Sequence, residues 1–130
     1  MTQQIQAEII SEFEFFDNWE DKYQHIIDLG KSLPAMPEDF KTEEFKVHGC
    51  QSNVWLYPKL QNDTVHFFAD SDAIITKGLI ALILKVVQDK SPKEIKNTDF
   101  NFIETIGLKE HLSPTRANGL SAMIEKIKST

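Results

Sequence analysis

The sequence predicts an α+β fold in which a small three-stranded antiparallel sheet is flanked by helices. Apolar residues recur at helical spacing before residue 31, alternate with polar residues between residues 45 and 69, and return to helical spacing from residue 73 onward. Because the strands are consecutive and the helices lie before and after them, this order favours α+β over alternating βαβ units. The chain has 130 residues without repeats or a linker, which predicts one domain over 1–130.

Two amphipathic helices are predicted before the sheet. Ile5, Ile9 and Phe13 form one apolar stripe at a spacing of four residues. Asn18 is a suitable N-cap for the second helix, and Gly30 marks its end. The short connection between the two helices indicates an antiparallel pair.

The three predicted strands cover residues 45–47, 53–60 and 64–69. Apolar and partly polar positions alternate along the second strand, which is typical of a half-buried sheet. Pro58 places this strand at a sheet edge or at a bulge, because proline has no N–H to donate. Residues 61–63 are expected to form the turn between the second and third strands.

The remaining residues predict a buried central helix followed by shorter ones. Residues 73–87 are apolar on nearly all sides. Gly78 inside this helix costs about 1 kcal/mol relative to alanine, which suggests a close approach by a neighbouring element. Ser91-Pro92 and Ser113-Pro114 each predict the start of a helix. A further short helix is expected within 98–106.

Composition excludes several classes of function. The formal charge is −6, from 20 acidic and 14 basic residues, and no run of Lys or Arg is present. A nucleic-acid binder is therefore not expected. One cysteine and four histidines without zinc-site spacing predict no metal site. Without an evident signal peptide or an apolar stretch of membrane-spanning length, we expect no membrane association and a soluble cytoplasmic protein.

Cys50 is the only strong nucleophile in the chain and follows a glycine at a predicted turn. Gly49 allows a positive φ angle or a close approach by another segment. A lone cysteine is also often a small buried packing residue, and position alone makes that reading as reasonable as a chemical one. A stand-alone cysteine hydrolase would need a base, and no local pattern selects His25, His66 or His111 for that role.

The segment from His48 to Leu56, His-Gly-Cys-Gln-Ser-Asn-Val-Trp-Leu, resembles the Gly-Cys-Gln-Ser-x-Val-Trp signature of the SufE family of cysteine desulfuration proteins. Three further blocks agree in order and spacing, at 34–37, 69–79 and 107–120. Together the blocks span nearly the whole chain. The resemblance implies a small antiparallel sheet flanked by helices, similar to the IscU scaffold.

The resemblance also implies a function. Cys50 would accept sulfur as a persulfide from a pyridoxal-phosphate-dependent cysteine desulfurase, stimulate that enzyme and pass sulfur to an iron–sulfur cluster scaffold. Pyridoxal phosphate would belong to the partner, so no cofactor is expected in this chain, which would carry sulfur rather than act as a stand-alone catalyst. Alternatively, the sulfur would be used for thiolation of tRNA or of molybdopterin. An alternative from another class of function is a non-covalent interaction module that regulates a partner, in which Cys50 is only a packing residue.

A single cysteine suits a persulfide carrier, because no second thiol can convert the persulfide into an internal disulfide. The resemblance further implies that Cys50 is sheltered in an apolar cavity, for which Val54, Trp55 and the helix over 73–84 are candidate walls. Burial there would raise the pKa of the thiol.

Five residues are candidates for supporting the site or contacting the desulfurase, namely His48, Gly49, Gln51, Asp72 and Arg116. Arg116 lies in the first turn of a predicted helix, where the helix dipole disfavours a cation. We therefore expect it to pair with an acidic residue such as Asp72 or with the partner. Asp72 is also a candidate N-cap of the central helix, and Gln51 is expected to satisfy backbone groups of the turn.

Overall fold

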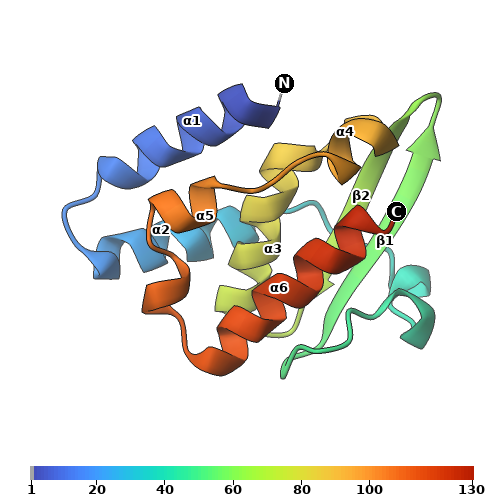
Figure 1. Cartoon of the computed structure of the whole chain (residues 1–130). Coiled ribbons are helices and arrows are strands. Elements are labelled where there is room, and N and C mark those ends of the chain that lie inside the picture. The colour runs from blue at the N-terminus through green and yellow to red at the C-terminus, as the bar shows by residue number, and fades with distance from the viewer. Residues whose placement is uncertain (1) are drawn as a thin grey trace.

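The computed structural model describes residues 2–130 and shows helices packed against one face of a β-hairpin (Figure 1). The helices and strands, in chain order, are α1 (Thr2–Glu14), α2 (Trp19–Lys31), β1 (Val54–Gln61), β2 (Thr64–Ser71), α3 (Ile74–Val87), α4 (Pro92–Lys96), α5 (Phe102–Thr105) and α6 (Pro114–Lys128). Short 3-10 turns cover Glu38–Phe40, Glu43–Phe45 and Lys109–His111. Helices and an antiparallel sheet confirm the α+β class.

The prediction of a third strand is wrong, because the sheet described within residues 2–130 has two strands. The backbone N–H groups of Phe45 and Lys46 donate to carbonyls three residues back, which forms a 3-10 turn rather than a ladder. Lys46 then makes one isolated bridge to Trp55, and the N–H of Val47 donates to the carbonyl of Val54 at 2.8 Å. The chain turns away immediately afterwards at Gly49.

The hairpin itself follows the prediction. β1 and β2 pair antiparallel from Val54 opposite Ser71 to Gln61 opposite Thr64. Asn62 in the connecting turn has a φ of 56°, a left-handed conformation that asparagine tolerates better than most residues. Pro58 pairs with Phe67 without a bulge and lies in an edge strand, as the sequence predicts.

Helix α3 occupies the centre of the molecule (Figure 1), in contact with β2, α1, α2 and α6. Apolar residues cover nearly all of its circumference, and Ile80, Ile83 and Val87 are fully buried. The close approach predicted at Gly78 is confirmed. A Cβ atom added there would lie 2.1 Å from the backbone oxygen of Ile26 on α2.

The predicted helix starts are also confirmed. The side chain of Asn18 accepts a hydrogen bond from the backbone N–H of Asp21. Ser91 and Ser113 cap α4 and α6 in the same way. These caps satisfy N–H groups that have no partner inside the helix. They depend only on residues three positions apart, which is why local sequence is sufficient to predict them.

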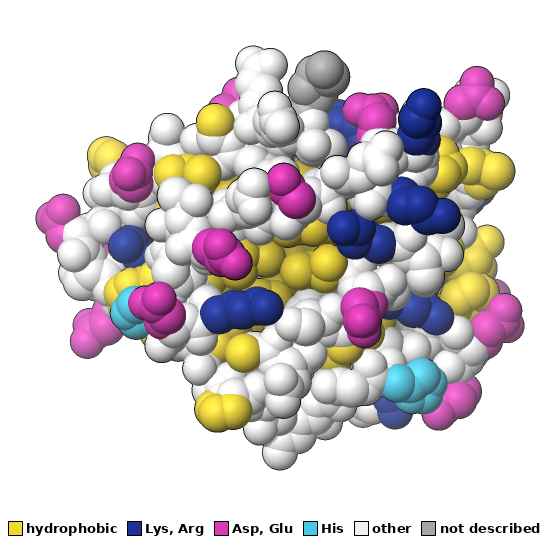
Figure 2. Space-filling model, viewed as in Figure 1, with side chains coloured by type: hydrophobic (Ala, Val, Ile, Leu, Met, Phe, Trp, Pro, Cys, Tyr) yellow, Lys and Arg dark blue, Asp and Glu magenta, His cyan; other side chains and the backbone are white. Residues whose placement is uncertain are grey.

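On the face seen in Figure 2, basic and acidic side chains are interspersed. This face has no continuous basic stripe of the kind that nucleic-acid binders use to follow a phosphate backbone. Within residues 2–130, none of the helices combines the length and apolar character needed to cross a membrane.

Candidate functional site

The loop between Lys46 and β1 carries Cys50 and folds back against α6. Gly49 has a φ of 99°, a left-handed conformation that residues with a Cβ rarely adopt. A Cβ atom at this position would also lie 3.1 Å from the Cβ of Ala122 on α6. Glycine is therefore required here both by conformation and by space, and the turn it makes directs the next residue toward α6.

The thiol of Cys50 lies against the backbone of α6. Its Sγ donates a hydrogen bond to the carbonyl of Gly119 at 3.6 Å, across 69 positions of sequence. A Cβ atom added to Gly119 would lie 3.3 Å from Sγ, so the absence of a side chain there makes room for the sulfur. Cys50 is half-buried, and burial raises the pKa of its thiol.

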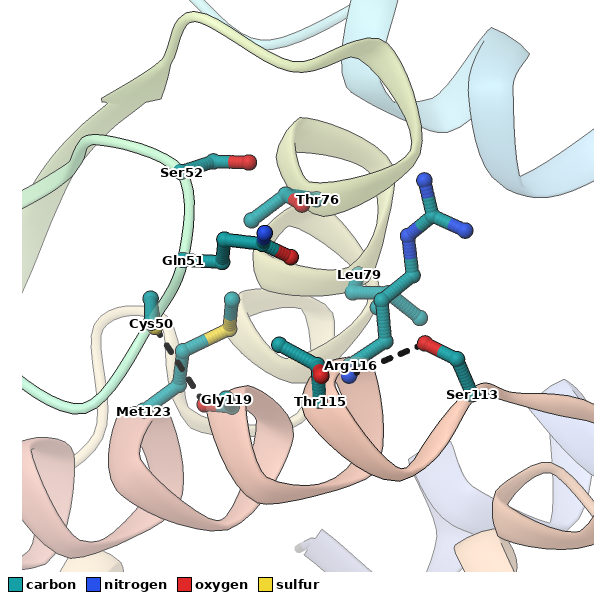
Figure 3. A pocket seen from close by; sticks show the side chains of 10 residues that line it. All are labelled: Cys50, Gln51, Ser52, Thr76, Leu79, Ser113, Thr115, Arg116, Gly119 and Met123. Atoms are coloured by element: carbon teal, nitrogen blue, oxygen red, sulfur yellow. Dashed lines mark hydrogen bonds between the residues drawn. The ribbon is translucent and has the colours of Figure 1, made fainter.

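A cavity of about 180 Å³ opens beside Cys50 (Figure 3). Its walls come from the Cys50 loop, from α3 and from α6 with its N-cap Ser113. The lining residues are Cys50, Gln51, Ser52, Thr76, Leu79, Ser113, Thr115, Arg116, Gly119 and Met123. The site is thus a mixed cavity, with Leu79 and Met123 as its apolar part and hydroxyl, amide and guanidinium groups around them.

The prediction that Val54 and Trp55 line this cavity is wrong. The central helix does contribute, through Thr76 and Leu79, but Val54 and Trp55 do not line the cavity. Val54 is fully buried in the main core. Trp55 points to the opposite side of the hairpin because successive strand residues alternate, and the amino group of Lys41 lies 5.9 Å from its ring centre.

The structure brings together some of the sequence-predicted residues. Gln51 and Arg116 line the cavity with Cys50, and Gly49 shapes the loop. His48 is exposed and does not line the cavity. Figure 3 shows the side chain of Arg116 rising from α6 along the cavity, while its backbone N–H donates to Ser113.

Asp72 does not take the two structural roles predicted for it, the N-cap of α3 and the ion pair with Arg116. Its carboxylate accepts hydrogen bonds from the backbone N–H of Asn53 at 3.1 Å and from the Asn53 side chain at 2.8 Å. The N-cap of α3 is Ala73, without a side-chain cap, so that prediction is wrong. The ion pairs among residues 2–130 do not include one between Asp72 and Arg116. Asp72 instead joins the end of the Cys50 loop to the start of α3.

The segment that precedes α6 is held by α2. The ring of Trp19 stacks on that of His111 with centroids 3.9 Å apart, and the Tyr23 hydroxyl donates to the carbonyl of His111. Ser113, which caps α6, follows two residues later. These contacts fix the position of the first turn of α6, and with it one wall of the cavity.

Sequence reasoning missed several lining residues, including Thr76, Thr115, Gly119 and Met123. Thr76 could have been noticed as a polar residue inside an otherwise apolar helix. Within residues 2–130, no group of three or more His, Cys, Asp or Glu side chains is arranged to hold a metal ion. The chemistry of the site therefore centres on one thiol and its surrounding polar groups.

Comparison with known proteins identifies the family. The family model described as "SufE: Fe-S metabolism associated domain" matches residues 7–130. The chain belongs to the SufE family. The motif around Cys50 and the blocks at 69–79 and 107–120 lie within the matched region.

Named relatives of this SufE-family protein cover most of its length. An uncharacterised SufE-like protein of Rhizobium meliloti is 46% identical over 127 residues, 94% of this chain and 91% of the relative. A second, from Rhizobium etli, is 43% identical over 93% of this chain and 85% of the relative. The sulfur acceptor protein CsdE of Escherichia coli K12 is 40% identical over 84% of this chain and 76% of CsdE.

The fold also matches a solved structure. The solution structure of a hypothetical protein from Thermus thermophilus superposes with a TM-score of 0.79, over 96% of this chain and 91% of the other. At 20% identity this likeness concerns the fold alone. A mixed fold of helices around a small antiparallel sheet is therefore shared with an experimentally determined structure.

Proposed function

We propose that Cys50 accepts sulfane sulfur from the persulfide of a pyridoxal-phosphate-dependent cysteine desulfurase, stimulates that enzyme, and delivers the sulfur to an iron–sulfur scaffold. The observation that carries the proposal is the position of the single cysteine, on a loop and beside a cavity, in a SufE-family chain. Its similarity to CsdE, which is named a sulfur acceptor protein, supports the same assignment.

The transfer is a thiol exchange reaction. The thiolate of Cys50 attacks the outer sulfur of the donor persulfide, a new S–S bond forms on Cys50, and the S–S bond of the donor breaks. The donor cysteine leaves as a thiolate, which takes up a proton. Atoms and electrons balance without an external oxidant, because the sulfane sulfur moves between two thiols at the same oxidation level.

The surroundings of Cys50 suit a resting acceptor. Burial raises the pKa of the thiol, so the half-buried form is mostly protonated and reacts slowly at neutral pH. Docking on the desulfurase would then have to expose the loop, which removes the effect of burial. With no second cysteine in the chain, the persulfide has no internal thiol to attack it. A reducing cytoplasm, where thiols remain free, fits this chemistry.

Cys50→Ser tests the transfer. The oxygen of serine does not accept sulfane sulfur, so we expect this variant to abolish stimulation of desulfurase turnover while still binding the enzyme. Intact-protein mass spectrometry after incubation with desulfurase and cysteine should show the mass of one added sulfur atom on the wild type and none on the variant. Unchanged stimulation by Cys50→Ser would instead support an interaction module in which Cys50 only packs.

The partner-facing roles of His48, Gln51, Asp72 and Arg116 belong to the same proposal. His48, Asp72 and Arg116 are exposed around the Cys50 loop, where a docking enzyme would meet them. Alanine at His48 or Arg116 should weaken binding to the desulfurase without changing the fold. Exposed Lys59, on the distal part of the hairpin, provides a matched control, since its replacement by alanine should leave binding unchanged.

A further inference from the structure

The helix pair α1 and α2 carries nearly all of the net negative charge of the chain. Residues 2–31 contain seven acidic and two basic residues, whereas the net charge of the whole chain is −6. The connection between the two helices lies at the end of the molecule opposite the hairpin (Figure 1), and acidic side chains are visible at that end in Figure 2. Such a concentration of one sign of charge attracts a cationic partner.

A groove of about 480 Å³ at this end of the molecule contains an exposed aromatic ring. Phe15 is 81% exposed, more than any other large apolar side chain among residues 2–130. Its ring packs edge-on against Phe16 with centroids 5.6 Å apart, and Phe16 in turn packs on the ring of His25 at 5.1 Å. The exposed ring is therefore supported from below, and a partner that covers it gains the free energy of removing apolar surface from water.

Three carboxylates line the same groove without a basic partner. The ion pairs among residues 2–130 include none with Asp17, Asp21 or Asp28. Asp21 accepts a hydrogen bond from the side-chain amide of Asn18 at 3.2 Å, and Asp28 accepts one from Gln24 at 3.0 Å. These amides are neutral, so they orient the two carboxylates without cancelling their charge.

A polar atom below the groove also lacks a hydrogen-bond partner. Nε2 of His25 is buried and makes no hydrogen bond within residues 2–130. Oε1 of Glu12 lies 3.4 Å from it but is not in hydrogen-bonding geometry. Because buried polar atoms are nearly always hydrogen-bonded, the chain by itself leaves this end of the molecule incompletely satisfied.

We propose that this α1–α2 groove docks a basic segment of a protein partner, in which an arginine covers Phe15 and basic side chains pair with the three carboxylates. A guanidinium suits the groove because it stacks on an aromatic ring and also binds carboxylates. The same carboxylates repel nucleic acid and anionic lipid. The groove and the Cys50 cavity share no lining residue, so the partner binds without covering Cys50. This docking role is separate from sulfur transfer.

The test is a nuclear magnetic resonance titration of the isotope-labelled full chain with a short peptide of repeating arginine, leucine and alanine. The largest changes in amide chemical shift should fall on residues 14–28. The affinity should decrease as the NaCl concentration rises, because salt screens exposed charges. Saturating peptide should leave the rate of Cys50 alkylation by iodoacetamide unchanged.

Matched variants separate the groove from other exposed surface. Phe15→Ser should raise the Kd for the peptide about tenfold, as expected for an aromatic anchor, whereas Leu60→Ser, at an exposed apolar position of the hairpin, should leave it unchanged. The double variant Asp17→Asn and Asp28→Asn should raise the Kd about fivefold. Asp63→Asn, in the hairpin turn, is its control.

Shifts spread evenly over the surface, or centred outside residues 14–28, would overturn the proposal. An equal loss of affinity in Leu60→Ser would do the same, as would equal binding of a peptide with glutamate in place of arginine. Sedimentation of the protein alone tests the other occupant: a concentration-dependent dimer that Phe15→Ser abolishes would mean that a second copy of the chain fills the groove, contrary to the proposal.

Discussion

At the scale of single residues, the chemistry of the site is set by what the Cys50 thiol touches. Sγ contacts the carbonyl of Gly119 and is half removed from solvent. Neither contact stabilises a negative charge on sulfur: a carbonyl oxygen is an acceptor, and burial disfavours the ionised form. The resting thiol is therefore held in its protonated state, and the enclosed cysteine is protected rather than activated.

This predicts a shifted pH profile for alkylation of Cys50. In the folded protein without added sulfur, the alkylation rate of Cys50 should rise with pH with an apparent pKa above the ordinary thiol value of about 8.5. Denaturation should return this apparent pKa to the ordinary value. Because the folded pKa is raised, the stabilising effect of the protonated thiol is present below the unfolded pKa and is lost as pH rises through the folded pKa. Cys50→Ser should remove that loss from the pH dependence of stability above about pH 8.5. A folded-state midpoint at or below the ordinary value would contradict the burial argument.

At the scale of elements, the crossing of α2 and α3 depends on two facing glycines. A Cβ atom on Gly30 would lie 2.7 Å from the backbone nitrogen of Gly78, and one on Gly78 would lie 2.1 Å from the backbone oxygen of Ile26. Both clashes involve backbone atoms, which cannot rotate away as a side chain can. Because α3 also supplies one wall of the Cys50 cavity, the crossing of α2 and α3 sets the position of that wall.

Gly78→Ala should therefore destabilise the fold by about 3 kcal/mol, because the two helices must separate to admit a methyl group. Denaturant unfolding followed by circular dichroism measures the change in free energy. The double variant with Gly30→Ala should cost less than the sum of the single variants, since one separation serves both methyl groups. Ile74→Ala, at an exposed position of the same helix, is the control. Full additivity of the two glycine variants would contradict this account.

At the scale of the whole molecule, one carboxylate joins β2 and α3 to the segment around Lys41, which lies 29 positions earlier in the sequence. Asp70 at the end of β2 accepts from Lys41 of the long loop at 2.7 Å and pairs with Lys77 of α3 at 3.3 Å. Burial alone would raise the pKa of Asp70 and is the largest single effect. The hydrogen bonds from Lys41, from the backbone of Ser71 and from Lys77 together outweigh it and lower the pKa of Asp70.

Asp70→Asn should lower the free energy of unfolding by about 1 kcal/mol near neutral pH, the size expected for a partly exposed ion pair. Because the folded pKa of Asp70 is lowered, its contribution is present above the unfolded value near 3.9 and is lost as pH falls through the folded pKa. The stability difference between wild type and variant should therefore shrink below about pH 4. Denaturant unfolding of both proteins at pH 7 and pH 3 measures this difference in the free energy of unfolding. A difference that does not change with pH would exclude an ionic origin.

The features that the sequence determined by itself are those that depend on neighbours along the chain. The caps at Asn18, Ser91 and Ser113 and the Asn62 turn depend on residues a few positions apart. The choice of Cys50 as the chemical centre needed only its uniqueness and its motif. Gly78 was recognisable because a glycine inside an apolar helix requires a packing reason.

The tertiary structure alone decided the surroundings of that cysteine. Sγ meets Gly119 across 69 positions, and Thr76 reaches the same cavity from another helix. Local propensity carries no information about such contacts, which depend on how α3 and α6 pack. The missing third strand has the same cause: residues 45–47 have strand-like composition, but the turn at Gly49 ends the pairing after one bridge. The cysteine that we propose as the sulfur carrier is thus identifiable from the sequence, whereas the groups around it are set by the packing of distant segments.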